Sequence, residues 1–130
     1  VELVNTGTGS VNLADYRLTD SNNPLENLPS VALSPGQRIV VLAGGTAPGD
    51  GTPHVTFGLG RTDSLSLFRG NEEVDYVGWG SDQSKNGRSY GRLNGTGGVW
   101  EALYPTPGYG NVAYVLFTRE RVFTARVEID

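Results

Sequence analysis

Apolar residues along the chain form short runs separated by glycine, proline, asparagine, aspartate and serine. Residues 64–69 alternate strictly, which puts Leu65 and Leu67 on one face of a strand, whereas residues 38–43 are a continuous apolar run typical of a buried strand. No stretch of ten or more residues repeats with a period of 3.6. The pattern therefore predicts an all-β chain of eight or nine short strands, at residues 1–5, 11–20, 31–33, 38–43, 54–59, 64–69, 73–79, 88–93 and 99–103.

The alternation within these runs also predicts which side chains point inward. Val1 and Leu3 share a face of the first strand. The inward residues of the second strand are Leu13, Tyr16 and Leu18. In the strand at 73–79 we place Val74, Tyr76 and Gly78 on one face, so that Asp75 points outward.

Glycine and proline mark the turns. In Ser34-Pro35-Gly36-Gln37, proline presets φ at the second position and glycine permits positive φ at the third, which is the chemistry of a type II turn. The connection at 69–72 predicts a hairpin, and the glycines at 95, 97 and 98 predict another between strands 88–93 and 99–103. Short strands at roughly ten-residue spacing favour a β-sandwich over a propeller or solenoid.

Composition excludes several classes of protein. There is no cysteine, which rules out disulfides and thiolate zinc sites. The net charge of −4 argues against nucleic-acid binding, because the phosphate backbone is repelled. No apolar run approaches the ~18 residues of a membrane span.

The composition changes after Asn111. Residues 112–130 contain no glycine and hold two further candidate strands, at 113–117 and 122–129. We therefore predict a sandwich domain over residues 1–111, with 112–130 as a strand-rich extension or the start of a following domain.

Four segments, taken in order, resemble the lamin tail domain. They are VELVNTGTGSVNLADYRLTD (1–20), LSPGQRIVVLA (33–43), FGLGRTDSLSLFRGNEEVDYVGW (57–79) and SYGRLNGTGGVWEALYPTPGYGN (89–111). The last segment supplies the signature residues of the resemblance, which are Gly91, Arg92, Trp100, Pro105, Pro107, Gly108 and Asn111.

The resemblance implies an immunoglobulin-like β-sandwich. It also implies an interaction or targeting module in a secreted or cell-surface bacterial protein, with a protein or a cell-surface component as partner. The family has one more strand before the equivalent of Val1. An unpaired sheet edge is therefore expected. We expect this edge to pair with strand 113–117 or 122–129, or to form a homo-oligomer through exposed edge strands.

The residue types needed for catalysis are sparse. His54 is the only histidine, and no Gly-x-Ser-x-Gly motif accompanies it. Glu72 and Glu73 lie at a hairpin tip, where solvated charge is the default. The loop around Asp50 has too few oxygen ligands for calcium, and Asp82 stands alone in another loop. We therefore expect no enzymatic activity, no cofactor and no metal.

Two ambiguities remain open at the level of sequence. Trp79 and Trp100 could form the stacking platform of a carbohydrate-binding β-sandwich module, or pack into a sandwich core. Arg92 could pair with a carboxylate across the sheet or contact a partner.

Overall fold

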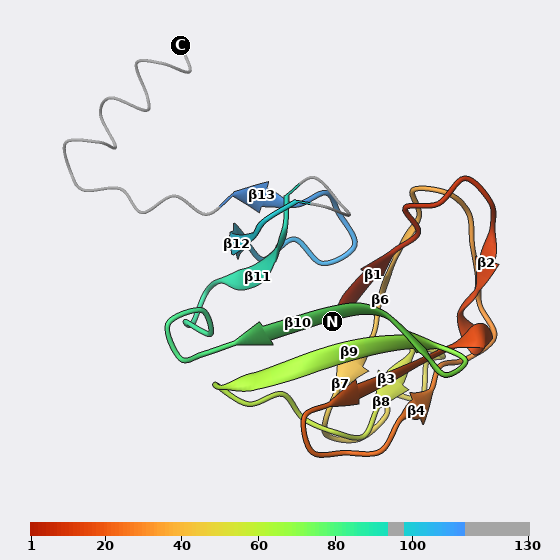
Figure 1. The fold of residues 1–130 in the computed structure, drawn as a ribbon, viewed down its shortest axis with the longest axis horizontal. Helices are drawn as coiled ribbons and strands as arrows, with labels where there is room; N and C mark the ends of the chain where they lie inside the picture. The colour runs from red at the N-terminus through yellow and green to blue at the C-terminus, as the bar shows by residue number, and fades with distance from the viewer. Residues whose placement is uncertain (94–97, 114–130) are drawn as a thin grey trace, which may run out of the picture.

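The chain folds as an all-β protein (Figure 1) in a computed structural model that describes residues 1–93 and 98–113. One 3₁₀ turn, η1 (Leu13–Asp15), interrupts the strands, and no α-helix occurs in these two ranges. The strands are β1 (Glu2–Val4), β2 (Val11–Asn12), β3 (Tyr16–Asp20), β4 (Glu26–Asn27), β5 (Ala32–Leu33), β6 (Arg38–Val40), β7 (Leu42–Ala43), β8 (His54–Val55), β9 (Asp63–Arg69), β10 (Glu72–Trp79), β11 (Ser89–Arg92), β12 (Trp100–Tyr104) and β13 (Val112–Ala113).

The strands form several sheets, as expected of a β-sandwich. The largest has the order β10-β9-β3-β4, and a second has the order β11-β12-β13. Three two-stranded pairs complete the fold, namely β1–β6, β2–β5 and β7–β8. Figure 1 shows β9 and β10 running side by side, with β11, β12 and β13 grouped at one end of the molecule. The predicted all-β class is confirmed.

The hydrophobic core lies between the four-stranded sheet and the short strand pairs. Leu18 on β3 has no solvent exposure, and Leu13 on η1 is buried beside it, as the alternation predicted. Tyr16, Leu65 and Leu67 pack partly buried against this cluster, and so do Val1 and Leu3. The buried members are Leu13, Leu18, Leu28, Leu33, Val41, Val55 and Phe57.

The segment 11–20 is not one strand, as its sequence suggested. Asn12 accepts a hydrogen bond from the Ala14 N–H at 2.9 Å through its side-chain oxygen, which caps η1. The turn then redirects the chain from β2, which pairs with β5, to β3, which pairs with β4 and β9. The imperfect alternation in this segment reflects that break.

The apolar run at 38–43 also divides, at Val41. Before it, β6 pairs antiparallel with β1, and after it β7 pairs parallel with β8. The chain therefore changes sheets within six residues, and Leu42 remains 41% exposed, so the prediction of one buried strand was wrong. The strand predicted at 54–59 is only the two-residue β8, although Phe57 beyond it is buried.

Two of the predicted turns lie in the described residues, and both have the backbone geometry that their residues favour. Gln37 donates its N–H to the Ser34 carbonyl at 3.0 Å, and Gly36 has φ of +79°, as a type II turn requires. Gly70 has φ of +61° in the hairpin that pairs Arg69 with Glu72. The third predicted turn, at 94–97, lies outside the described residues, as do strand 122–129 and most of 113–117.

A β-bulge reverses the predicted faces of β10. Glu73 lies opposite Phe68, but Asp75 lies opposite the next residue, Leu67, so Val74 is the extra residue. Because one inserted residue changes the phase of a period-2 pattern, Asp75 shares the inner face with Leu67. Val74 and Tyr76 are 44% and 53% exposed, and the prediction that they point inward was wrong.

The short strand β4 was not predicted, and its Glu26 joins two sheets. The Glu26 carboxylate accepts hydrogen bonds from the Thr56 N–H at 2.9 Å and from the Thr56 hydroxyl. Partial burial raises the pKa of Glu26, but these hydrogen bonds outweigh burial and hold the pKa below its ordinary value. Glu26 therefore ties β4 to the chain just after β8.

This lowered pKa predicts acid sensitivity. The carboxylate stabilises the fold fully above the ordinary glutamate pKa of about 4.3, and its contribution is lost as pH falls through the lower folded-state pKa. We expect the urea midpoint to fall between about pH 6 and about pH 3, and to fall less in Glu26→Gln. Glu72→Gln, at the exposed hairpin tip, is the control and should follow the wild-type curve. Identical pH profiles for Glu26→Gln and the wild type would contradict the assignment.

Candidate functional site

A cleft of 970 Å³ separates β1, the inner face of β9–β10 and the β11–β12 hairpin. Its walls combine aliphatic side chains, including Leu65, Leu67 and Val77, with aromatic ones. The volume is at the upper end of the range for ligand pockets in proteins. A shallower depression of 480 Å³ beside His54 is lined by loop residues.

Asp75 and Arg92 form an ion pair across the cleft. Asp75 comes from the inner face of β10, where the bulge directs it, and Arg92 comes from the end of β11. The Arg92 guanidinium also lies over the Trp100 ring, 4.5 Å from its centroid. The structure therefore places Arg92 in a cross-sheet pair with a carboxylate, one of the two roles considered from sequence.

The two tryptophans line this same cleft. Trp100 stacks on Tyr90 with ring centroids 5.9 Å apart. Trp79 donates its indole N–H to the Gly60 carbonyl at 2.9 Å. Both indoles are half-buried, so each contributes packing and an accessible face. The two residues predicted as a stacking platform are brought to one cleft, although far apart in sequence.

Asp63 fixes the loop that holds Trp79. Its carboxylate accepts hydrogen bonds from the Gly60 N–H at 2.9 Å and from the Ser21 hydroxyl at 2.9 Å. Partial burial raises the pKa of Asp63, but the hydrogen bonds from Gly60, Ser64 and Ser21 lower it more. The ionised Asp63 therefore positions the Gly60 carbonyl, which accepts the hydrogen bond from the Trp79 indole.

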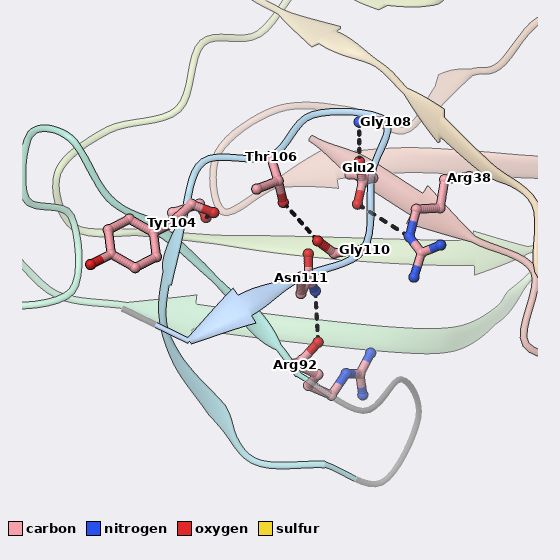
Figure 2. Close-up of polar contacts among 9 residues, drawn as sticks. Glu2, Arg38, Arg92, Tyr104, Thr106, Gly108, Gly110 and Asn111 are labelled. Carbon is pink, nitrogen blue, oxygen red and sulfur yellow. Dashed lines mark hydrogen bonds and ion pairs between the residues drawn. The ribbon is translucent and has the colours of Figure 1, made fainter. Parts of the chain in front are cut away.

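The signature residues Gly91, Arg92 and Asn111 come together at the wall of the cleft. Asn111 donates its side-chain N–H to the Arg92 carbonyl at 2.7 Å (Figure 2). Gly91 faces the buried Leu103, and a Cβ on Gly91 would lie 2.8 Å from Leu103 Cδ1. Glycine therefore serves close packing at this position and not an unusual backbone conformation, since its φ is not positive.

Gly91→Ala is expected to lower the free energy of unfolding by about 1–2 kcal/mol, because the added methyl forces Leu103 out of its packed position. Gly110→Ala is the matched control, since a Cβ there meets nothing within 4 Å. Urea unfolding of both variants would measure the difference. Equal stability of the two would show that Leu103 accommodates the methyl without strain.

The loop after β12 is tied to β1. The Gly108 N–H donates to the Glu2 carboxylate at 2.6 Å, and Glu2 also pairs with Arg38 at 3.8 Å (Figure 2). Thr106 closes the loop by donating its hydroxyl to the Gly110 carbonyl at 3.1 Å. Gly108 has φ of +83°, and Pro105 and Pro107 line the cleft at the start of the loop. The loop therefore contacts the first strand, and the sheet continues beyond it with β13, which pairs with β12.

Large apolar side chains are exposed at two places on and around the three-stranded sheet. Tyr104, Tyr109 and Val112, which we call the apolar patch, lie on β12, on β13 and in the loop between them, and Tyr109 is 76% exposed. Leu93 and Val99, the latter 79% exposed, lie at the opposite end of the β11–β12 hairpin. Sequence reasoning missed this patch. The one feature of the sequence that indicated it was Tyr109, which follows Pro107-Gly108 in a turn, where side chains are usually at the surface.

The candidate catalytic residues have separate neighbours. His54 Nε2 lies 2.9 Å from the Gly44 carbonyl oxygen. Asp50 accepts the Thr52 N–H at 2.9 Å, and Asp82 lies 3.9 Å from Lys85 Nζ. Glu72 and Glu73 are exposed at the hairpin. Within residues 1–93 and 98–113, no three or more histidine, cysteine or carboxylate side chains are grouped so that they could hold a metal ion.

Comparison with known proteins gave no match to a family model, to a curated protein or to a solved structure. Across the described parts of the chain, no helix has the length and apolar character needed to cross a membrane. The site therefore has to be interpreted from its own geometry.

Proposed function

We propose that this chain is a non-catalytic interaction or targeting module, an immunoglobulin-like sandwich of the lamin-tail type within a larger, exported bacterial protein. The order of the four sequence landmarks and the all-β architecture both support this assignment. A fold alone does not determine function, which depends on the chemical groups that the surface presents. Its partner is a protein or a cell-surface component.

The observation that carries the proposal is the apolar patch. Soluble monomers rarely expose contiguous large apolar groups, and such patches mark interaction sites. Here Tyr104 and Val112 are neighbours across the β12–β13 ladder, and Tyr109 lies in the loop between those two strands. Aromatic residues dominate interface hot spots, which makes Tyr109 the strongest candidate contact.

Affinity capture with point variants tests this proposal. The immobilised chain is incubated with secreted and cell-surface protein fractions, and bound proteins are quantified by mass spectrometry. Val112→Ser and Tyr109→Ser should each reduce recovery of the partner by about fivefold or more, as expected for interface contacts. Val74→Ser, which removes an exposed apolar side chain outside the patch, should leave recovery unchanged. Equal recovery by all four proteins would overturn the proposal.

A carbohydrate-binding module is the second candidate, favoured by the position of Trp79 and Trp100 on one cleft. Half-buried indoles beside a paired Arg92 and Asp75 combine stacking faces with polar groups, as sugar sites do. Binding on a glycan array that disappears in Trp79→Ala and Trp100→Ala, with unchanged circular dichroism, would support it. An array with no signal for the wild type would exclude it.

A further inference from the structure

Among the described residues, the first strand pairs on one side only, with β6, and its other edge has no partner strand. The Val1 amino group and carbonyl bond to Val41 at 2.9 and 2.8 Å, and the Asn5 N–H bonds to the Gln37 carbonyl at 3.0 Å. In an antiparallel ladder, hydrogen-bonded residues alternate with residues whose N–H and C=O point the other way. The backbone groups of Glu2 and Val4 therefore point away from β6, and no described residue bonds to them.

This edge opens onto the cleft. All of residues 1–7 line it, so the cavity follows β1 along its length. Opposite lie Leu65, Leu67 and Val77 on the four-stranded sheet, and Leu103 on β12. A strand laid beside β1 would direct every second side chain towards these aliphatic groups.

The charges in the cleft define the inward face of an occupant. Asp75 is paired with Arg92, and Glu2 is engaged by Arg38 and by the Gly108 N–H. Figure 2 shows Glu2 held between these last two groups. Because burying an unpaired charge beside satisfied pairs is costly, the complementary inward face is uncharged and apolar.

The exposed edge of β10 is protected. On β10 the Tyr76 N–H donates to the Asp75 carboxylate at 2.9 Å, and that carboxylate is held by Arg92. Glu72, Glu73 and the bulge at Val74 protect the start of this edge, as charges and bulges do in natural sheets. Of these two edges, β1 is therefore the better site for strand addition.

We propose that the cleft binds an extended peptide segment of a partner protein, which adds as a strand to the free edge of β1. Alternate apolar side chains of that segment enter the cleft, and its backbone bonds to Glu2 and Val4. This inference goes beyond the proposed function, because it places a binding site in the cleft and not on the apolar patch. The occupant is a separate protein segment with an uncharged, alternating pattern.

Selection from a phage-displayed library of random dodecapeptides on the full chain, followed by calorimetry with the synthetic peptides, tests the proposal. We expect enriched sequences to be apolar at alternate positions. Val4→Pro removes the outward N–H without touching the β1–β6 ladder, and should weaken binding by about tenfold. Val4→Thr retains the N–H and should bind like the wild type.

N-methylation of the peptides gives a second measurement, which stands even if Val4→Pro fails to fold. Methylating the amides that face β1 should abolish binding, whereas methylating the alternate amides should not. Failure to enrich any peptide, or equal binding to wild type and Val4→Pro, would overturn the inference. So would glycan binding that needs Trp79 and Trp100 but not the Val4 N–H, or a dimer of this chain that Val4→Pro dissociates.

These outcomes are separable from those of the proposed function. If Val112→Ser and Tyr109→Ser lose the partner while Val4→Pro retains it, the patch is the binding surface and strand addition is wrong. If peptides bind along β1 but the patch variants recover the partner fully, the patch argument fails and the cleft remains.

Discussion

Leu18→Ala is expected to lower the free energy of unfolding by about 3 kcal/mol, measured by urea denaturation. Leu18 has no solvent exposure and lies at the centre of β3, where its neighbours on the inner face include Leu67 on β9. Removing the side chain loses its transfer free energy and leaves a cavity between strands that are held by ladders on both sides. The sheet cannot collapse into that space without breaking a ladder.

Leu42→Ala is the matched control for this variant. Leu42 is also a strand leucine, but it is 41% exposed, so its truncation should cost less than about 1 kcal/mol. A loss in Leu18→Ala as small as that in Leu42→Ala would mean that the core is not centred on β3. An unchanged denaturant slope would show that both variants keep the same cooperative unit.

Asn5→Ala is expected to cost about 2 kcal/mol, although it removes only one small polar side chain. The Asn5 amide is buried and donates to the Gly9 and Leu33 carbonyls, each at 2.9 Å. Its oxygen accepts the Gly7 N–H at 3.0 Å. Alanine would leave backbone groups without partners in a part-buried site, and such groups carry the full cost of their desolvation.

Asn22→Ala provides the comparison, because Asn22 is an exposed loop asparagine whose side chain, within the described parts of the chain, bonds only to the neighbouring Ser21. Its substitution should change stability by no more than about 0.5 kcal/mol. Thermal unfolding of both variants gives the result directly. If Asn5→Ala matched Asn22→Ala, water would have to replace the three lost hydrogen bonds.

Glycine and proline mark the turns between strands, and their positions made much of the fold predictable. The turns at Pro35-Gly36 and at Gly70 need backbone geometries that these residues favour, so the strands on either side could be placed. The inward residues Leu65 and Leu67 followed from simple alternation, and Leu13 and Leu18 were placed inward from an imperfect one. The break at η1 left its trace in that imperfect alternation, whereas the change of sheet at Val41 leaves no break in the apolar run.

The faces of β10 could not be predicted, for a specific reason. Val74 fits a regular inward position as well as a bulge, and only the pairing with Phe68 and Leu67 distinguishes the two. Similarly, Trp79 and Trp100 could each be singled out by residue type, but their meeting at one cleft depends on how the sheets pack. The exposure of Val99 depends on the same packing.

The order of pairing along the chain also has a consequence for folding speed. The β9–β10 hairpin needs a loop of only two residues. By contrast, β3 pairs only after Leu18 contacts Leu67, and β1 pairs only after Val1 contacts Val41, both over long sequence separations. Such distant contacts require loop closure before they yield any stabilisation, so folding is expected on a millisecond-to-second timescale. Because the hairpin is the most local of these pairings, we expect it to form first, and β3 to pair with it before β1 pairs with β6.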